Sequence, residues 1–310
     1  LNMVNPKIQI SDLDVIVING KDSETFLQGQ ITNDIRIIKD EEKAIYAGYC
    51  NQKGRLIAFF LIIKVWDNYF LFCPSSIGSE ISKKLSIYIM RSEVYLNHSS
   101  EDISYFSFYG GGKEEQSFKD CGGILPKILM QNIQQSHKDG RSTSFSVTKL
   151  PGENDRYFVL GNNKTIKAIY LEIYPNSGGL DSNSWHESDI ETKIPNIFKE
   201  TQDKFIPQSL NLDLIDAINF KKGCYTGQEI VARTHYLGKS KRRMYLGSIN
   251  ADKPPKLGDA VTTDGNKVGQ IINICKKENG LYWVLFEIII EKISSKLMLC
   301  DTKILIKVIN

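Results

Sequence analysis

Short apolar runs separated by polar turns recur along most of the chain, a pattern that predicts many β-strands with helices between them. Residues 14–18 form a compact β-branched run that ends at Asn19-Gly20. Residues 56–63 are apolar at every position, which is typical of a central strand buried on both faces. Further strands are predicted at residues 69–72, 94–96, 103–109, 145–147 and 156–160.

Helical spacing of apolar residues appears between these strands. Helices are predicted after the Asp22-Ser23 cap and at residues 81–88, 124–137, 163–174 and 229–236. The triple glycine at 110–112 is not followed by a lysine–serine pair, and no helix is predicted there at phosphate-loop spacing, so we expect a flexible loop. The order of elements predicts an α+β body with antiparallel sheets.

The pattern changes after Tyr236, where short strands and turn residues dominate. Strands are predicted at residues 244–247, 260–263, 268–274, 281–290 and 303–309. Asp264-Gly265-Asn266 is a strong hairpin turn. We therefore expect a small β-barrel or sandwich at residues 237–310, following an α+β body at residues 1–236.

Composition and charge narrow the function classes. The chain has 310 residues and a net charge of only +3, so nucleic-acid binding would need a local patch rather than a global field. None of the 6 cysteines are near neighbours, which argues against a disulfide framework, a structural zinc site or an iron–sulfur cluster held by this chain alone. We predict no metal. Because no apolar run reaches bilayer length and no secretory signal pattern is present, we expect a cytoplasmic protein.

One cysteine stands out by its surroundings. Residues 221–229 read KKGCYTGQE, so Cys224 follows two lysines and is bracketed by Gly223 and Gly227 before a predicted helix. Cations and a helix N-terminus both favour thiolate over thiol, which makes Cys224 a candidate for redox chemistry or covalent attachment. The alternative is a small buried apolar residue.

Cationic residues gather around the same stretch. Residues 221–243 contain seven lysines or arginines and one acid, Glu229. Such a patch attracts a carboxylate tail, a phosphate or an RNA backbone, and the alternative is a solvated linker. The four histidines show no metal spacing. His235 is near Cys224 in sequence, but a helix would carry it away from the thiol. Trp185 is either a packing anchor or a flat wall for a planar ligand.

Three segments carry a family resemblance: residues 26–34 (FLQGQITND), residues 50–55 (CNQKGR), and a block from 205–208 (FIPQ) through 221–229 to 231–233 (VAR). Trp185 and the turn at 194–197 fall at matching positions. The chain resembles the YgfZ family, folate-binding relatives of the glycine-cleavage aminomethyltransferase, or T protein. The lysine–glycine–cysteine block is specific, and the match weakens past residue 245.

The resemblance implies a body of two intertwined α+β units around a central hole, with a C-terminal β-barrel. It implies that tetrahydrofolate is the bound cofactor and that the partners are iron–sulfur enzymes, including one that methylthiolates tRNA. Members are cytoplasmic. On this interpretation the protein is an accessory factor for tRNA modification, with a weak tRNA contact through residues 221–243.

The resemblance also assigns roles to residues. It places the reactive pair at Cys224 and Lys222 and the folate contacts at Trp185 and Leu13. The family has a second tryptophan where this chain has Leu13. The remaining motif positions support the loop; they are Tyr225, Gly227, Gln228 and Glu229.

A departure from the T protein bears on catalysis. The aspartate that activates the one-carbon unit in the T protein falls at Ala58 here. Alanine cannot transfer a proton, so aminomethyl transfer by that mechanism is not expected. Two alternatives remain: a folate-dependent one-carbon transferase or demethylase that uses another carboxylate, and an RNA-binding module.

Overall fold

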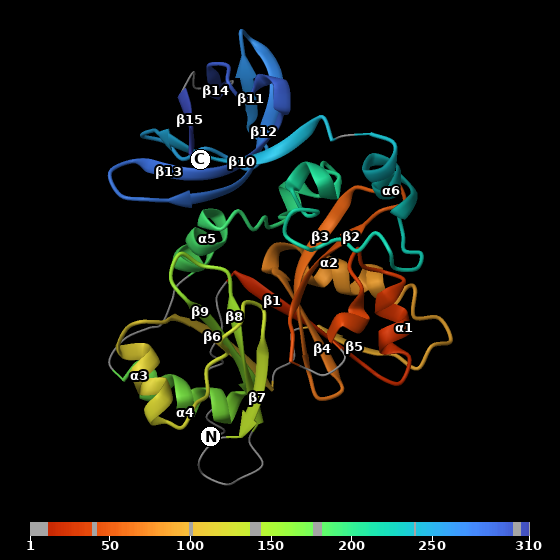
Figure 1. Ribbon diagram of the computed structural model, residues 1–310, viewed down its shortest axis with the longest axis vertical. Coiled ribbons are helices and arrows are strands. Elements are labelled where there is room, and N and C mark those ends of the chain that lie inside the picture. Colours follow the sequence, from red (N-terminus) through yellow and green to blue (C-terminus); the bar gives the residue numbers. More distant parts are fainter. Residues whose placement is uncertain are drawn as a thin grey trace, which may run out of the picture. The chain divides into compact units, whose positions relative to one another are not determined.

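The computed structural model describes residues 12–38, 42–98, 102–136, 144–175, 182–238, 240–299 and 305–309 (Figure 1). The chain divides into two compact units built from interleaved stretches of sequence. Unit 1 comprises Leu1–Glu24, Ile35–Ile45 and Leu61–Trp185, and unit 2 comprises Thr25–Asp34, Tyr46–Phe60 and His186–Asn310. The predicted division between residues 236 and 237 stays a prediction.

The first sheet is antiparallel where its register is defined, and it has the strand order β2-β3-β4-β1-β5. Its strands are β1 (Leu13–Asn19), β2 (Ile45–Cys50), β3 (Leu56–Val65), β4 (Asn68–Pro74) and β5 (Tyr95–His98). Of the ten residues of β3, nine are buried, as expected for a run that is apolar on both faces. Helix α1 (Ser23–Gln28) follows β1, and helix α2 (Ser75–Ser86) buries Ile77, Ile81 and Leu85 at four-residue spacing.

A second antiparallel sheet lies in unit 1, with the order β6-β9-β8-β7. Its strands are β6 (Ile103–Tyr109), β7 (Asn132–Ser136), β8 (Ser144–Leu150) and β9 (Arg156–Asn162). Helix α3 (Lys113–Asp120) and helix α4 (Asn163–Ile173) supply side chains to the same apolar core. The Asn162 side chain caps α4 by accepting a hydrogen bond from the Thr165 backbone N–H at 2.9 Å.

The predicted helix at residues 124–137 is wrong, since part of this stretch is strand β7 and the residues before it form an extended segment with turns. Ile128 and Leu129, two apolar residues of the predicted helix, are exposed. The Gln131 side chain instead accepts hydrogen bonds from the backbone N–H groups of Lys127 and Ile128. Pro126 has no N–H to contribute to a helix, and local side-chain-to-backbone bonds stabilise the turn in its place.

The expectation of a loop without a helix after the triple glycine is also wrong. Helix α3 begins at Lys113, directly after Gly112. Its first turn carries Glu114 and Glu115, and the Glu115 carboxylate accepts the Gly111 backbone N–H at 2.7 Å. Because carboxylates already occupy this helix start, it does not suit a phosphate.

Unit 2 contains a closed barrel with the order β10-β13-β12-β11-β14-β15 (blue in Figure 1). Its strands are β10 (Arg242–Asn250), β11 (Ala260–Thr263), β12 (Asn266–Lys276), β13 (Leu281–Ile289), β14 (Leu297–Leu299) and β15 (Leu305–Ile309). Alternating apolar residues fill its interior. The predicted hairpin turn at 264–266 connects β11 to β12, and residues 303 and 304 of the last predicted strand lie outside the described residues.

The remaining elements of unit 2 connect the barrel to its other segments. They are helix α6 (Gln228–Tyr236), the end of helix α5 (Ser182–Glu191) and short 3₁₀ turns at Lys199–Thr201 and Pro207–Leu210. The Arg243 guanidinium forms a bidentate pair with the Asp213 carboxylate, at 2.5 and 2.8 Å. The Asn273 side chain accepts the Asn196 N–H at 2.9 Å and donates to its carbonyl at 2.8 Å. No described helix has the length and apolar character to cross a bilayer.

Candidate functional site

Three segments that carry the resemblance meet within unit 2. We name them the cysteine loop (residues 221–227), the threonine segment (residues 26–34) and the asparagine turn (residues 51–55). They are far apart in sequence, and hydrogen bonds and close backbone approaches join them.

A buried lysine joins the cysteine loop to the threonine segment. The Lys222 side chain is 6% exposed, and its ammonium donates to the backbone carbonyls of Gln28 at 2.7 Å, Ile31 at 2.6 Å and Asn33 at 2.8 Å. An ammonium has three donors and no acceptor, so these three oxygens, the carbonyl cage, match its hydrogen-bonding capacity. The Tyr225 ring adds a cation–π contact, with Nζ 5.1 Å from its centroid.

The threonine segment is fixed in turn to the stretch that precedes the cysteine loop. The Thr32 hydroxyl donates to the Ala217 carbonyl at 2.7 Å, and the Thr32 carbonyl accepts the Asn219 N–H at 3.0 Å. The Asn33 side chain donates to the Asp216 carbonyl at 2.8 Å. The backbone on both sides of the carbonyl cage is therefore held by hydrogen bonds.

The asparagine turn approaches the other end of the cysteine loop. The Asn51 side chain accepts the backbone N–H groups of Lys53 at 2.8 Å and Arg55 at 3.0 Å, which closes the turn. Gly227 has a φ of 82°, and a Cβ there would lie 2.4 Å from the Asn51 carbonyl oxygen and 2.8 Å from the Gly54 Cα. The glycine is thus required both by its left-handed conformation and by the close packing of the two loops.

These constraints leave the thiol at the surface. Cys224 is exposed, whereas its neighbours Lys222 and Tyr225 are buried, and burial raises the pKa of the Tyr225 phenol. Helix α6 begins at Gln228, with Glu229 exposed in its first turn. The alternative interpretation of Cys224 as a buried apolar residue is therefore wrong. The catalytic role predicted for Lys222 stays a prediction, and its ammonium is directed to the carbonyl cage.

His235 has a partner of its own. Its imidazole stacks on the Phe220 ring, with centroids 3.7 Å apart and planes at 11°, and the Tyr236 ring meets it edge-on at 4.8 Å. No hydrogen bond joins His235 to Cys224 within the described ranges. The structure therefore gives His235 an aromatic packing role.

The predicted folate positions both lie in unit 1. Trp185 is 4% exposed, with the Arg156 guanidinium 4.6 Å from its ring centroid and the Phe158 ring at 5.6 Å. Leu13 is buried on β1, where its carbonyl accepts the Tyr105 hydroxyl at 2.6 Å. Sequence reasoning missed Arg156, although an arginine that opens an otherwise apolar strand was a signal.

Several cations of the predicted patch at residues 221–243 are already bound by other groups of the protein. Lys222 is in the carbonyl cage, Arg243 pairs with Asp213, and Arg242 pairs with Glu287 at 2.8 Å. Lys239 lies outside the described residues. The exposed cations that remain are Lys221, Arg233 and Lys241. In the part of the chain that the structure describes, no cluster of three metal-ligating side chains is present.

Cys224 is exposed and Cys50 and Cys73 are buried, so we predict that they react with an alkylating reagent at different rates. Iodoacetamide should label Cys224 in the native protein at least about tenfold faster than Cys50 or Cys73, because burial raises the pKa of both buried thiols and blocks access. Raising the pH to about 9 should leave Cys50 unlabelled, since it remains a protonated thiol. Peptide mass spectrometry measures each site, and equal rates for Cys224 and Cys50 would contradict the geometry.

The comparisons with known proteins bear on the family and the fold of the chain. No protein-family model matches the chain. A curated relative from Aliivibrio fischeri strain ES114, "tRNA-modifying protein YgfZ", is 30% identical over 88% of this chain and 81% of the relative. The protein of the same name from Sodalis glossinidius is 26% identical over 89% of this chain and 83% of the relative.

A solved structure shares the fold. The glycine cleavage system aminomethyltransferase T from Bartonella henselae superposes with a TM-score of 0.77, covering 99% of this chain and 87% of that one, at 13% identity. This similarity shows a mixed α/β fold like that of the T protein. With the sequence identity to the curated relatives over most of their length, it leads to one conclusion: the chain belongs to the YgfZ family.

Proposed function

We propose that this protein is a tetrahydrofolate-binding accessory factor that supports iron–sulfur enzymes, and thereby tRNA modification, in the cytoplasm. The observation that carries the proposal is the exposed Cys224 on a loop whose backbone is held by the carbonyl cage and by Gly227. A thiol on an anchored surface loop is accessible to another macromolecule. The names of the curated relatives, which are tRNA-modifying proteins, support a role in tRNA modification.

The residues around Trp185 suit a folate. An indole is a ring on which a pterin can stack, and the adjacent Arg156 guanidinium is a cation that can pair with a carboxylate, but both are buried here, so a folate would have to displace the side chains that cover them. Both side chains are at least nine-tenths buried, so they are held in place by packing. We propose that Trp185 and Arg156 hold the cofactor, with Leu13 contributing apolar contact. When bound, tetrahydrofolate would supply a carrier for one-carbon units.

Cys224 would act as the nucleophile or ligand toward a partner, and Lys222 would position it. With its three donors directed to the carbonyl cage, Lys222 fixes the loop from which Cys224 projects. The predicted support residues act in the same way: Tyr225 packs under the ammonium, and Gly227 with Gln228 and Glu229 opens α6.

Ala58 bears on the alternative activity of a one-carbon transferase. It is fully buried on β3, and its methyl group can neither accept nor donate a proton. Aminomethyl transfer through an aspartate at this position is therefore not available, and the accessory role is the function we favour. Turnover of a methylated or aminomethylated amine with tetrahydrofolate would favour the transferase instead.

Tetrahydrofolate binding should depend on Trp185. Trp185→Leu should weaken the affinity, measured by calorimetry, at least about tenfold, equivalent to about 1.4 kcal/mol, because a ring surface is lost. Trp66→Leu is the matched control, since Trp66 is 40% exposed in the turn between β3 and β4. Equal affinities for the two variants, or no binding by the unmodified protein, would overturn the folate site.

The thiol should be required for the cellular role. In a bacterial strain that lacks its own family member, the unmodified chain should restore tRNA methylthiolation, and Cys224→Ser should reduce it to the background level. Cys121→Ser is the control, as Cys121 is a partly exposed cysteine of unit 1. Full restoration by Cys224→Ser would remove the thiol from the mechanism.

A further inference from the structure

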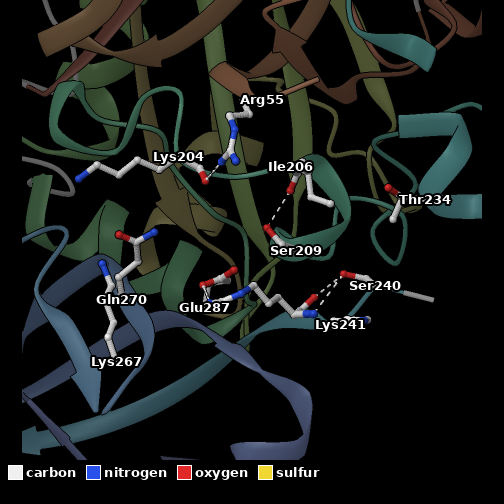
Figure 2. A pocket seen from close by; sticks show the side chains of 11 residues that line it. Arg55, Lys204, Ile206, Ser209, Thr234, Ser240, Lys241, Lys267, Gln270 and Glu287 are labelled. Atoms are coloured by element: carbon white, nitrogen blue, oxygen red, sulfur yellow. Dashed lines mark hydrogen bonds and ion pairs between the residues drawn. The ribbon is translucent and has the colours of Figure 1, made fainter. Parts of the chain in front are cut away.

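A cleft of about 530 Å³ lies within unit 2, beside the barrel (Figure 2). Arg55 and Lys204 lie on one side of it, and Lys267 and Gln270 of strand β12 lie on the other. Lys241, directly before β10, lines it as well. The cations therefore come from four separate stretches of sequence, and only Lys241 and Arg242 belong to the patch predicted at residues 221–243.

The charge of the lining is strongly positive. Five cations face one carboxylate, that of Glu287, which is 4% exposed and paired with Arg242 at 2.8 Å. Burial raises the pKa of Glu287, and the nearby Arg242, Lys267 and Arg55 oppose that shift. Apart from the Arg242–Glu287 pair, four cations line the cleft, and none of them forms an ion pair with a described carboxylate. They are Arg55, Lys204, Lys241 and Lys267.

The lining offers hydrogen-bond donors rather than apolar contact. The Arg55 guanidinium is held by one bond to the Lys204 carbonyl at 2.6 Å, which leaves its other N–H groups for a ligand. The Gln270 amide faces the same space. Ile206 is the one apolar side chain among the described residues that line the cleft. An acidic peptide would need apolar or aromatic anchors, whereas a phosphate backbone needs only cations and polar donors.

We propose that this cleft binds the phosphodiester backbone of an RNA strand without reading its bases. Arg55, Lys204, Lys241 and Lys267 would each neutralise a phosphate, and the absence of an aromatic ring from the described lining leaves the bases unstacked. The site does not depend on the folate site or on Cys224, so it goes beyond the proposed function.

The experiment measures the affinity for an unmodified tRNA transcript as salt rises from about 50 to about 200 mM. Lys204→Gln/Lys267→Gln should weaken binding and reduce the slope of log affinity against log salt by about 1.4–1.8, as two phosphate contacts are lost. The control is Lys83→Gln/Lys113→Gln, which removes the same charge from exposed lysines of unit 1. Cys224→Ser should bind tRNA like the unmodified protein.

The outcomes separate the alternatives. A reduced slope for the cleft variant alone supports the RNA site, whatever the result of the folate and thiol experiments. An equal slope for the two double variants, or no measurable tRNA binding, would overturn it. Competition by a poly-glutamate peptide as effective as that by RNA of equal charge would also overturn it, and would indicate an acidic protein partner.

Discussion

The bonds between one ammonium and three backbone carbonyls hold the site together. Lys222 is buried, and a buried ammonium is stable only where its donors are satisfied. The carbonyls of Gln28, Ile31 and Asn33 satisfy them, and each belongs to a segment nearly two hundred positions earlier in the chain. The interaction therefore holds the cysteine loop against the threonine segment, and Cys224 is exposed on the loop that it anchors.

The distribution of cations shows why charge in sequence differs from charge in space. The patch at residues 221–243 has a large formal excess, but Lys222, Arg242 and Arg243 are taken up by carbonyls or carboxylates. The cations that we propose bind an anion line the cleft instead, where Arg55 and Lys204 lie near Lys267 of the barrel. Cations that are clustered in sequence can thus be engaged in intramolecular hydrogen bonds and ion pairs. Cations without such partners can come together from distant parts of the sequence.

Much of the fold follows from local patterns. The β-branched and alternating runs identified most strands, and the sequences around Asn163 and Gln228 identified helices α4 and α6. The helix predicted at residues 124–137 was wrong because Ile128 and Leu129 have helical spacing but are exposed, so they do not pack against a core. Helix α3 was missed since its polar sequence has only one buried apolar residue, Phe118.

The site was predictable in its residue types but not in its contacts. Cys224 and the glycines around it stand out in the sequence, yet the partners of Lys222 are main-chain oxygens, which have no sequence signature. The same holds for Gly227. Only glycine fits there because a Cβ would collide with the Asn51 carbonyl, and this contact has no sequence signature. Contacts of this kind arise only once distant segments are packed together.

The most direct measurement of this account compares the free energies of unfolding of Lys222→Met and Lys221→Met in urea. The two lysines are adjacent, but Lys221 is exposed. Lys222→Met should lose at least about 3 kcal/mol, since three charged hydrogen bonds disappear and buried carbonyls lose their partner. Lys221→Met should stay within about 0.5 kcal/mol of the unmodified protein. Equal stabilities for the two variants would contradict the carbonyl cage as the interaction that holds the site.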